Sequence, residues 1–294
     1  QVMLVTLNEV LKDARNNKYA VGLFNTVNLE MARGVLSAAE ESRSPVIIGT
    51  AEVLLPYASL EDLAPMLISL ARKATVPVVL HFDHGLTPEC IYKAIELGFT
   101  SVMYDCSTKS FEKNCESVAE LVKYAHSRGV TVEAELGHVG ANDSSAEGEG
   151  LQDHSIYTEP SEAKLYCEET GVDALAVAIG TLHGAYKSKP KLDFERLAEI
   201  AGMVDVPLVL HGGSGLSDDD FRRVIANGIS KVNIFTDINN AAAGAACEGY
   251  SQGRGMTDLM PLITEAVKQA TLEKIRLFRS EEHTSELQSQ FHLV

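Results

Sequence analysis

Eight short apolar runs, separated by longer amphipathic segments, constrain the fold of this chain more than any other feature of its sequence. The runs are rich in β-branched residues and nearly continuous in apolar character, which is typical of parallel strands buried on both faces of a sheet. They occupy residues 20–25, 45–50, 76–83, 101–105, 130–136, 174–180, 206–213 and 231–236. A chain of 294 residues can bury all of them in one large α/β unit.

Helical patterns fill the intervals between these runs. Residues 87–98 show typical helix boundaries, with Thr87 at the cap position, Pro88 in the first turn and Gly98 at the end. The other helical patterns lie at 28–42, 60–74, 110–129, 161–171, 193–204, 217–228 and about 257–278. Eight alternations of strand and helix predict an α/β fold, a single-domain (β/α)8 TIM barrel. The alternative is a doubly wound open sheet, which usually has a Gly-rich turn after its first strand, and "FNTVN" is no such turn.

The barrel is expected to span residues 1–280. Residues 281–294 lack the helical pattern before them and are expected to be a non-native or disordered tail. Residues 137–155 are rich in Gly, Ser, Asp and Glu, and are expected to form a mobile loop over the mouth of the barrel.

The composition excludes several classes of partner. The chain has 25 basic and 41 acidic side chains, a formal charge of −16, so it has no electrostatic reason to bind nucleic acid or an anionic membrane. Any anionic ligand has to be captured locally, by backbone amides, a metal or a few basic groups. Five cysteines without a C-x-x-C pair argue against a disulfide framework and favour a cytoplasmic protein with reduced thiols. The sequence has no run of about 18 apolar residues that would predict a membrane span.

Polar side chains gather at the ends of the predicted strands, where the catalytic groups of a barrel lie. Three imidazoles at three strand ends, with a fourth position open, predict a catalytic zinc site. The histidines are His84, His183 and His211, and the acidic residues at strand ends or within the strands are Asp83, Asp105, Glu133 and Glu135. His81 lies two residues before Asp83 on the same face of the strand and is expected to be a buried orienting group. His126 and His138 have no such placement and are expected at the surface.

A second signal is the stretch "HGGSG" at 211–215, which follows the seventh predicted strand. It offers exposed amides, a hydroxyl group and no Cβ obstruction before the next helix, an arrangement that binds phosphate through backbone N–H groups. The stretch "NIFTD" at 233–237 ends the eighth strand and can close the other side of such a site. Barrels often bind a phosphate between strands seven and eight.

These motifs together resemble the zinc-dependent class II ketose-bisphosphate aldolases, which act on fructose or tagatose bisphosphate. The resemblance runs from about Leu4 to Arg279 and rests on "HFDHG", "YDCS", "VEAELG", "AIGTLHGAY", "LVLHGGSGLS" and "KVNIFT". It implies reversible aldol cleavage of a ketose 1,6-bisphosphate to dihydroxyacetone phosphate and glyceraldehyde 3-phosphate, a reaction of glycolysis. It also implies a homodimer or homotetramer, with the final helix as the expected contact.

The resemblance implies a role for each matching residue. The zinc ligands are His84, His183 and His211, the acid–base group is Asp83, and a second divalent site uses Asp105 and Glu135; a monovalent cation is also implied. The substrate-binding residues are Asn25, Gly184, Gly212, Gly213, Ser214, Asn233, Ile234, Phe235 and Thr236. This chemistry fits the residues, because zinc can stabilise the enediolate formed on cleavage while Asp83 takes the hydroxyl proton. No lysine ends a strand in position to form a Schiff base.

The sequence departs from the family pattern at two places. The mobile loop of the family often reads "GGxED", with a glutamate proposed to move a proton; here it reads "GANDSS", and Asp143 is the nearest catalytic equivalent. Before the last helix many members carry "DPRxY", whose arginine holds the far phosphate; here Met260 stands at that position, and Arg254 is a candidate substitute. These differences leave open a related ketose monophosphate as the substrate, as well as the choice between fructose and tagatose.

Two other functions are compatible with a barrel of this kind. A metal-dependent hydrolase commonly has an H-x-H pair after its first strand, and "FNTVN" lacks one. A non-catalytic sugar-phosphate-binding barrel could dispense with metal ligands, whereas this sequence retains all three candidate histidines. The residues therefore favour the aldolase.

Overall fold

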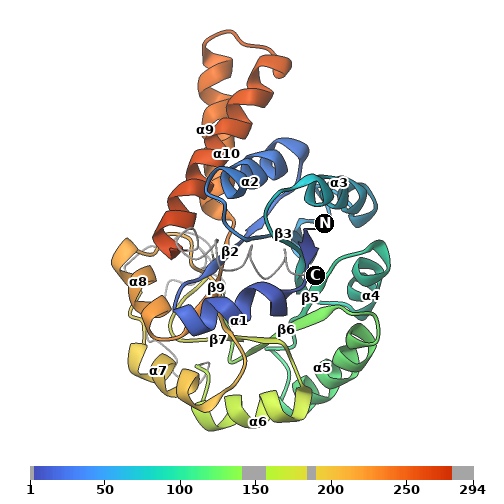
Figure 1. The fold of residues 1–294 in the computed structure, drawn as a ribbon, viewed down its shortest axis with the longest axis vertical. Helices are drawn as coiled ribbons and strands as arrows, with labels where there is room; N and C mark the ends of the chain where they lie inside the picture. Colours follow the sequence, from blue (N-terminus) through green and yellow to red (C-terminus); the bar gives the residue numbers. More distant parts are fainter. Residues whose placement is uncertain (1–2, 141–156, 184–189, 280–294) are drawn as a thin grey trace, which may run out of the picture.

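A closed parallel barrel forms the centre of the molecule (Figure 1). The computed structural model describes residues 3–140, 157–183 and 190–279. The pairing of neighbouring strands runs around the whole sheet, and it closes where the first barrel strand pairs with the last. The barrel strands are β2 (Val21–Asn25), β3 (Val46–Ala51), β4 (Val78–Gly85), β5 (Ser101–Tyr104), β6 (Thr131–Leu136), β7 (Ala174–Val177), β8 (Leu208–Leu210) and β9 (Ile229–Ile234). The predicted (β/α)8 barrel is confirmed.

Seven helices follow strands β2 to β8 and cover the outside of the barrel (Figure 1). They are α2 (Leu29–Glu41), α3 (Leu60–Lys73), α4 (Pro88–Leu97), α5 (Phe111–His126), α6 (Pro160–Thr170), α7 (Phe194–Met203) and α8 (Asp218–Ala226). Serine, asparagine or aspartate side chains cap α2, α3, α5, α7 and α8 by accepting a bond from a backbone N–H in the first turn. Thr87 occupies the N-cap position of α4 as expected, but its side chain makes no cap hydrogen bond. Its hydroxyl donates instead to Glu52 in η1 (Glu52–Leu54), 2.8 Å away.

The N-terminal segment closes one end of the barrel. A short strand, β1 (Leu4–Val5), adds to the first residues of β4, and α1 (Leu7–Asn17) follows it. Three α1 side chains, Leu7, Val10 and Leu11, are fully buried and belong to one apolar cluster with the barrel-lining residues of the strands. Each such side chain stabilises the fold by about 1.5–3 kcal/mol relative to an exposed one. The sequence analysis assigned neither element, and their position leaves the opposite, C-terminal end for the site.

The last two helices form an arm that projects from the barrel wall (Figure 1). They are α9 (Thr236–Ser251), which directly follows β9, and α10 (Met256–Phe278), which returns along it and packs on α2. The sequence analysis expected α10 but not α9. Among the helices of the described residues, none combines the length and apolar character needed to cross a membrane.

Candidate active site

An irregularity in β4 brings two consecutive side chains to the same place. The pairing of β4 with β5 shifts between Phe82 and Gly85, so that Asp83 and His84 together face a single residue of β5. His84 adopts a φ of 41°, a left-handed conformation that is uncommon for a non-glycine residue. In a regular strand Asp83 and His84 would point to opposite faces. The bulge instead allows both to line the same cavity.

The three predicted zinc ligands come together at the C-terminal end of the barrel. Each of His84, His183 and His211 offers a ring nitrogen, and these three atoms all lie within 4.8 Å of one another. The ring centres of His84 and His211 are 4.5 Å apart, and those of His84 and His183 are 4.9 Å apart. The structure therefore brings these rings close enough to converge on one ion, and their role as ligands stays a prediction.

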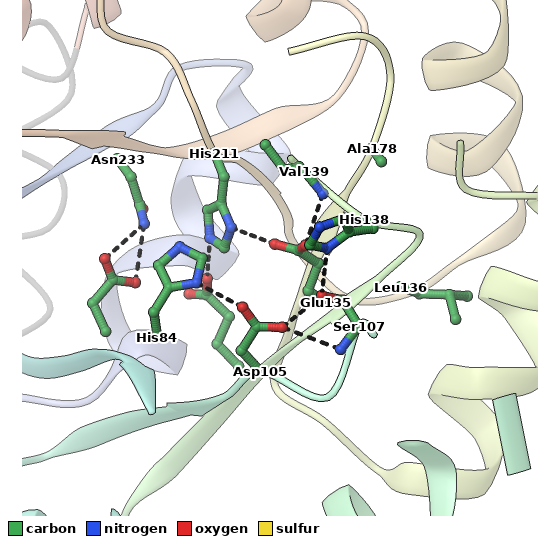
Figure 2. A network of polar contacts seen from close by, with 12 residues as sticks. His84, Asp105, Ser107, Glu135, Leu136, His138, Val139, Ala178, His211 and Asn233 are labelled. Atoms are coloured by element: carbon green, nitrogen blue, oxygen red, sulfur yellow. Dashed lines mark hydrogen bonds and ion pairs between the residues drawn. The ribbon is translucent and has the colours of Figure 1, made fainter. Parts of the chain in front are cut away.

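His211 contacts a carboxylate with each ring nitrogen, and Figure 2 shows its contact with Glu135. It is fully buried, and its Nδ1 lies 2.7 Å from Glu135 and its Nε2 2.9 Å from Glu133. Burial by itself lowers the pKa of His211, but the hydrogen bonds to Glu133 and Glu135 outweigh it and raise that pKa to about 10. Without a metal, His211 is therefore an imidazolium between two carboxylates.

The pKa values of the other two imidazoles shift in opposite directions. Burial, reinforced by the charges of His84 and His211, lowers the pKa of His183 to about 4, so this ring is neutral at pH 7. Burial acts to lower the pKa of His84 as well, but Asp83 and the hydrogen-bonded Asp105 raise it. The Nδ1 of His84 lies 2.9 Å from Asp105. Its Nε2 is buried and has no hydrogen-bond partner among the described residues.

The predicted acid–base group, Asp83, is held by two amides. Asn25 on β2 donates from Nδ2 to one carboxylate oxygen at 2.8 Å, and Asn233 on β9 donates to both oxygens at 3.0 and 3.2 Å. Burial alone would raise the pKa of Asp83, but the positive charges of His84, Lys231 and His211 hold it well below its usual value. Asp83 is thus an ionised carboxylate at neutral pH.

The residues predicted to form a second metal position also lie close together, and their role as ligands stays a prediction. His84, Asp105 and Glu135 offer ligand atoms within 4.8 Å of one another. Ser107 donates from its backbone and hydroxyl groups to Asp105, and its hydroxyl lies 3.0 Å from the Nδ1 of His138 (Figure 2). His138 was expected at the surface. It is partly exposed, but through Ser107 it is tied to this carboxylate cluster.

The residues predicted to bind substrate line one cavity of about 300 Å³ together with the candidate catalytic groups. Gly212 has a φ of 65°, and a Cβ there would lie 2.4 Å from the carbonyl oxygen of Leu182, so no larger residue fits this turn. Thr236 begins α9, which presents a helix N-terminus to the cavity. The lining residues are Asn25, Ala51, Val53, Leu54, Asp83, His84, His183, Gly212, Gly213, Ser214, Asn233, Ile234, Phe235 and Thr236. Gly184 and Asp143 lie outside the described residues.

The donor set fits a zinc ion. Three imidazoles are a typical ligand set for catalytic zinc. His84 offers a buried nitrogen that lacks a hydrogen-bond partner among the described residues, and His183 is neutral at pH 7. Both nitrogens of His211 are engaged by carboxylates, so one carboxylate has to release it before it can bind a metal.

Lys231 is the main site residue that sequence reasoning missed. It is fully buried inside the barrel, with its Nζ 2.8 Å from Glu133 and 2.7 Å from the Oδ1 of Asn233. The signal was present: a lysine two residues before Asn233 in an apolar strand points to the same face. His81 is fully buried, as expected, and it contacts Ser101 at 2.7 Å and lies 3.8 Å from Asp83. Its orienting role stays a prediction.

Comparison with known proteins agrees with this geometry. The family model for class II fructose-bisphosphate aldolase matches residues 5–283. The chain is 45% identical to the uncharacterized protein YdjI of Escherichia coli K12, over 95% of this chain and 99% of that protein. It is 41% identical to a fructose-bisphosphate aldolase of Geobacillus stearothermophilus, over 94% of this chain and 97% of that enzyme.

A solved structure shows the same relationship. The crystal structure of the YdjI aldolase from Escherichia coli K12 superposes with a TM-score of 0.85 and 41% sequence identity, covering 96% of this chain and 99% of that one. A match of the family model over nearly the whole chain, with relatives this similar, shows the family. The protein is a lyase and belongs to the class II fructose-bisphosphate aldolase family.

Proposed function

We propose that the protein catalyses the reversible, zinc-dependent aldol cleavage of a ketose 1,6-bisphosphate, fructose or tagatose, to dihydroxyacetone phosphate and glyceraldehyde 3-phosphate, a reaction of glycolysis. One observation carries the proposal. Asp83, held by Asn25 and Asn233, lines the same cavity as His84 and His183, and the nitrogen of His211 lies within 4.8 Å of theirs. An acid–base carboxylate beside three converging imidazoles is what this cleavage requires.

In cleavage, Asp83 takes the proton of the hydroxyl group on C4. The O–H electrons form the new carbonyl of the aldehyde, the C3–C4 bond breaks, and its electron pair passes to the ketone side as an enediolate. When bound, zinc would supply a Lewis acid that stabilises this negative charge. Asp83 is suited to its step because it is ionised and its oxygens are oriented by two amides. Return of a proton to C3 completes the reaction, and Asp143 is the residue proposed for it.

The proposed phosphate site lies between the loop after β8 and the start of α9. Gly212, Gly213, Ser214 and Thr236, the first residue of α9, line the cavity there. Amides and a helix N-terminus bind phosphate without basic side chains, which suits an acidic protein. We propose that Asn233, Ile234, Phe235 and Thr236, with Gly184, complete this site. A second divalent ion at Asp105 and Glu135, and a monovalent cation, are proposed from the resemblance.

A ketose monophosphate is the second candidate substrate. Two observations favour it: Met260 stands where many family members carry a phosphate-binding arginine, and the apolar side chains of Val53 and Leu54 line part of the cavity.

The five cysteines are free thiols, which supports a cytoplasmic protein. A homodimer or homotetramer is proposed from the family.

A coupled assay tests both substrates. Fructose and tagatose 1,6-bisphosphates and their 1-phosphate analogues are offered to the protein, with and without a chelator. We expect cleavage of at least one bisphosphate, abolished by the chelator and restored by zinc. Cleavage of the monophosphates alone would replace the bisphosphate proposal by the second candidate. Cleavage that survives complete removal of metal would overturn the zinc-dependent mechanism.

A further inference from the structure

The carboxylates around His211 decide which of its two ring nitrogens can bind a metal. To bind a metal, an imidazole has to present one unprotonated nitrogen, while the other usually donates its hydrogen to a nearby acceptor. Both nitrogens of His211 contact carboxylates, Nδ1 with Glu135 at 2.7 Å and Nε2 with Glu133 at 2.9 Å. One of these contacts has to be permanent and the other exchangeable, and the two carboxylates are held very differently.

Glu133 is anchored from both sides. Its second oxygen lies 2.8 Å from the ammonium group of Lys231, and both side chains are fully buried. Lys231 is fixed in turn by a hydrogen bond of 2.7 Å to the Oδ1 of Asn233. Moving Glu133 away from His211 would leave charges unpaired inside the barrel, which is costly.

The carboxylate of Glu135 has no buried ion pair with a lysine among the described residues, and it lies next to other potential metal ligands. Apart from His211, its carboxylate accepts a hydrogen bond of 3.0 Å from the backbone N–H of Val139 and lies 4.0 Å from the Nδ1 of His138. Its carboxylate lies in a second group of potential ligands with His84 and Asp105. Glu135 can therefore leave His211 and still find a partner of opposite charge, namely a metal ion.

We infer that Glu133 is a positioning residue, anchored by Lys231, which keeps the hydrogen of His211 on Nε2 and so makes Nδ1 the metal-binding atom. The carboxylate of Glu133 can only accept hydrogen bonds, so the nitrogen facing it has to be the donor. Glu135 gives up Nδ1 when the metal arrives. This inference rests on the zinc site proposed above, and it goes further by assigning the ligand atom and the group that selects it.

Two variants test the inference through zinc affinity, measured by competition with a chromophoric chelator and without any substrate. In Glu133→Gln, Lys231 attracts the amide oxygen, so the amide NH2 faces His211 and shifts its hydrogen to Nδ1. In the double variant Glu133→Leu with Lys231→Met, an apolar pair of similar size replaces the ion pair, a change that is often neutral for stability. We expect zinc affinity to fall by about 10- to 100-fold in both variants.

Asp173→Asn is the matched control. Asp173 also pairs with a histidine, His126, at 2.8 Å, but precedes β7 at the other end of the barrel. This variant should bind zinc within about twofold of the unmodified protein. If Glu133 served only to neutralise Lys231, the double variant would also retain that affinity, and this result would overturn the inference.

A crystal structure of the unmodified protein with zinc reads the assignment directly, even if the variants fail to fold. We expect Nδ1 of His211 on the metal and Nε2 still bonded to Glu133; the metal on Nε2 would refute the assignment. These readouts are independent of turnover. A protein that binds zinc in this way but cleaves no ketose phosphate would disprove the proposed function and leave the inference standing. A protein that binds no zinc would overturn the inference.

Discussion

The Nδ2 atom of Asn233 lies 3.0 and 3.2 Å from the two carboxylate oxygens of Asp83, so that β9 holds the end of β4 across the barrel. Asn25 adds a bond of 2.8 Å from β2. Hydrogen bonds to a charged group contribute about 1.5–3 kcal/mol each. The carboxylate is therefore fixed by residues that do not depend on the metal.

Removal of that carboxylate should stop the reaction without emptying the metal site. In Asp83→Ala, no group remains to take the hydroxyl proton, and we expect the rate of cleavage to fall by at least about 10²-fold. The zinc content should be unchanged, because the three imidazoles are intact. Turnover numbers and metal analysis on the same preparation check this, and unaltered turnover would refute the assigned role.

Loss of one imidazole should remove the metal as well as the activity. His183→Ala removes a ring that is neutral at pH 7 and lies close to His84. We expect both zinc content and cleavage activity to be lost together. The control is His126→Ala, a histidine with 44% of its side chain exposed and paired with Asp173 far from the site. Full metal content and rate in His183→Ala would count against the three-histidine site.

The metal-free protein should be most stable near neutral pH. The pKa values of His81 and His183 are lowered to about 4 by burial, so their contribution is lost as the pH falls from about 6.5 to 4, where the unfolded chain binds protons and the folded one does not. The pKa of His211 is raised to about 10, so its contribution is complete below pH 6.5 and is lost as the pH rises towards 10.

Thermal unfolding of the protein after metal removal with a chelator, measured from pH 4 to pH 10, gives both the acid and the alkaline loss of stability. His211→Gln should remove much of the alkaline fall and keep the acid one. A midpoint of unfolding that stays constant from pH 7 to 10 in the unmodified protein would contradict the assigned state of His211.

Substitutions in α1, at the closed end of the barrel, should lower the free energy of unfolding without changing the metal site. Leu11 of α1 is fully buried among strand residues, and Leu11→Ala should lower the free energy of unfolding by about 2–5 kcal/mol. Lys12→Ala, at the exposed neighbouring position, should change it by less than about 0.5 kcal/mol. Denaturant unfolding gives both values, and zinc affinity should be the same in the two variants.

The barrel and most of the described site could be predicted because their signals are local. A polar residue such as His84 or His211 at the end of an apolar run is visible in the sequence, and strand ends of a barrel meet at one rim. Lys231 was overlooked because its partners, Glu133 and Asn233, become its neighbours only when the barrel closes. The bulge that turns His84 inward is likewise a property of pairing between strands.

The helices α1 and α9 show a different limit. Four residues of α1, Leu7, Val10, Leu11 and Ala14, follow a helical period, but such a short segment has little stability apart from the barrel that it covers. In α9 only Ile238 and Gly249 are buried, so its sequence carries almost no amphipathic pattern.

The bulge in β4 places the proposed proton-transfer group and a proposed metal ligand on two consecutive residues. Asp83 and His84 are adjacent in sequence, and a left-handed turn of the backbone is what lets neighbours share a destination. The two proposed functions therefore depend on the same backbone conformation. A regular β4 strand would point either Asp83 or His84 away from the cavity, and the remaining residue would lack its partner in the reaction.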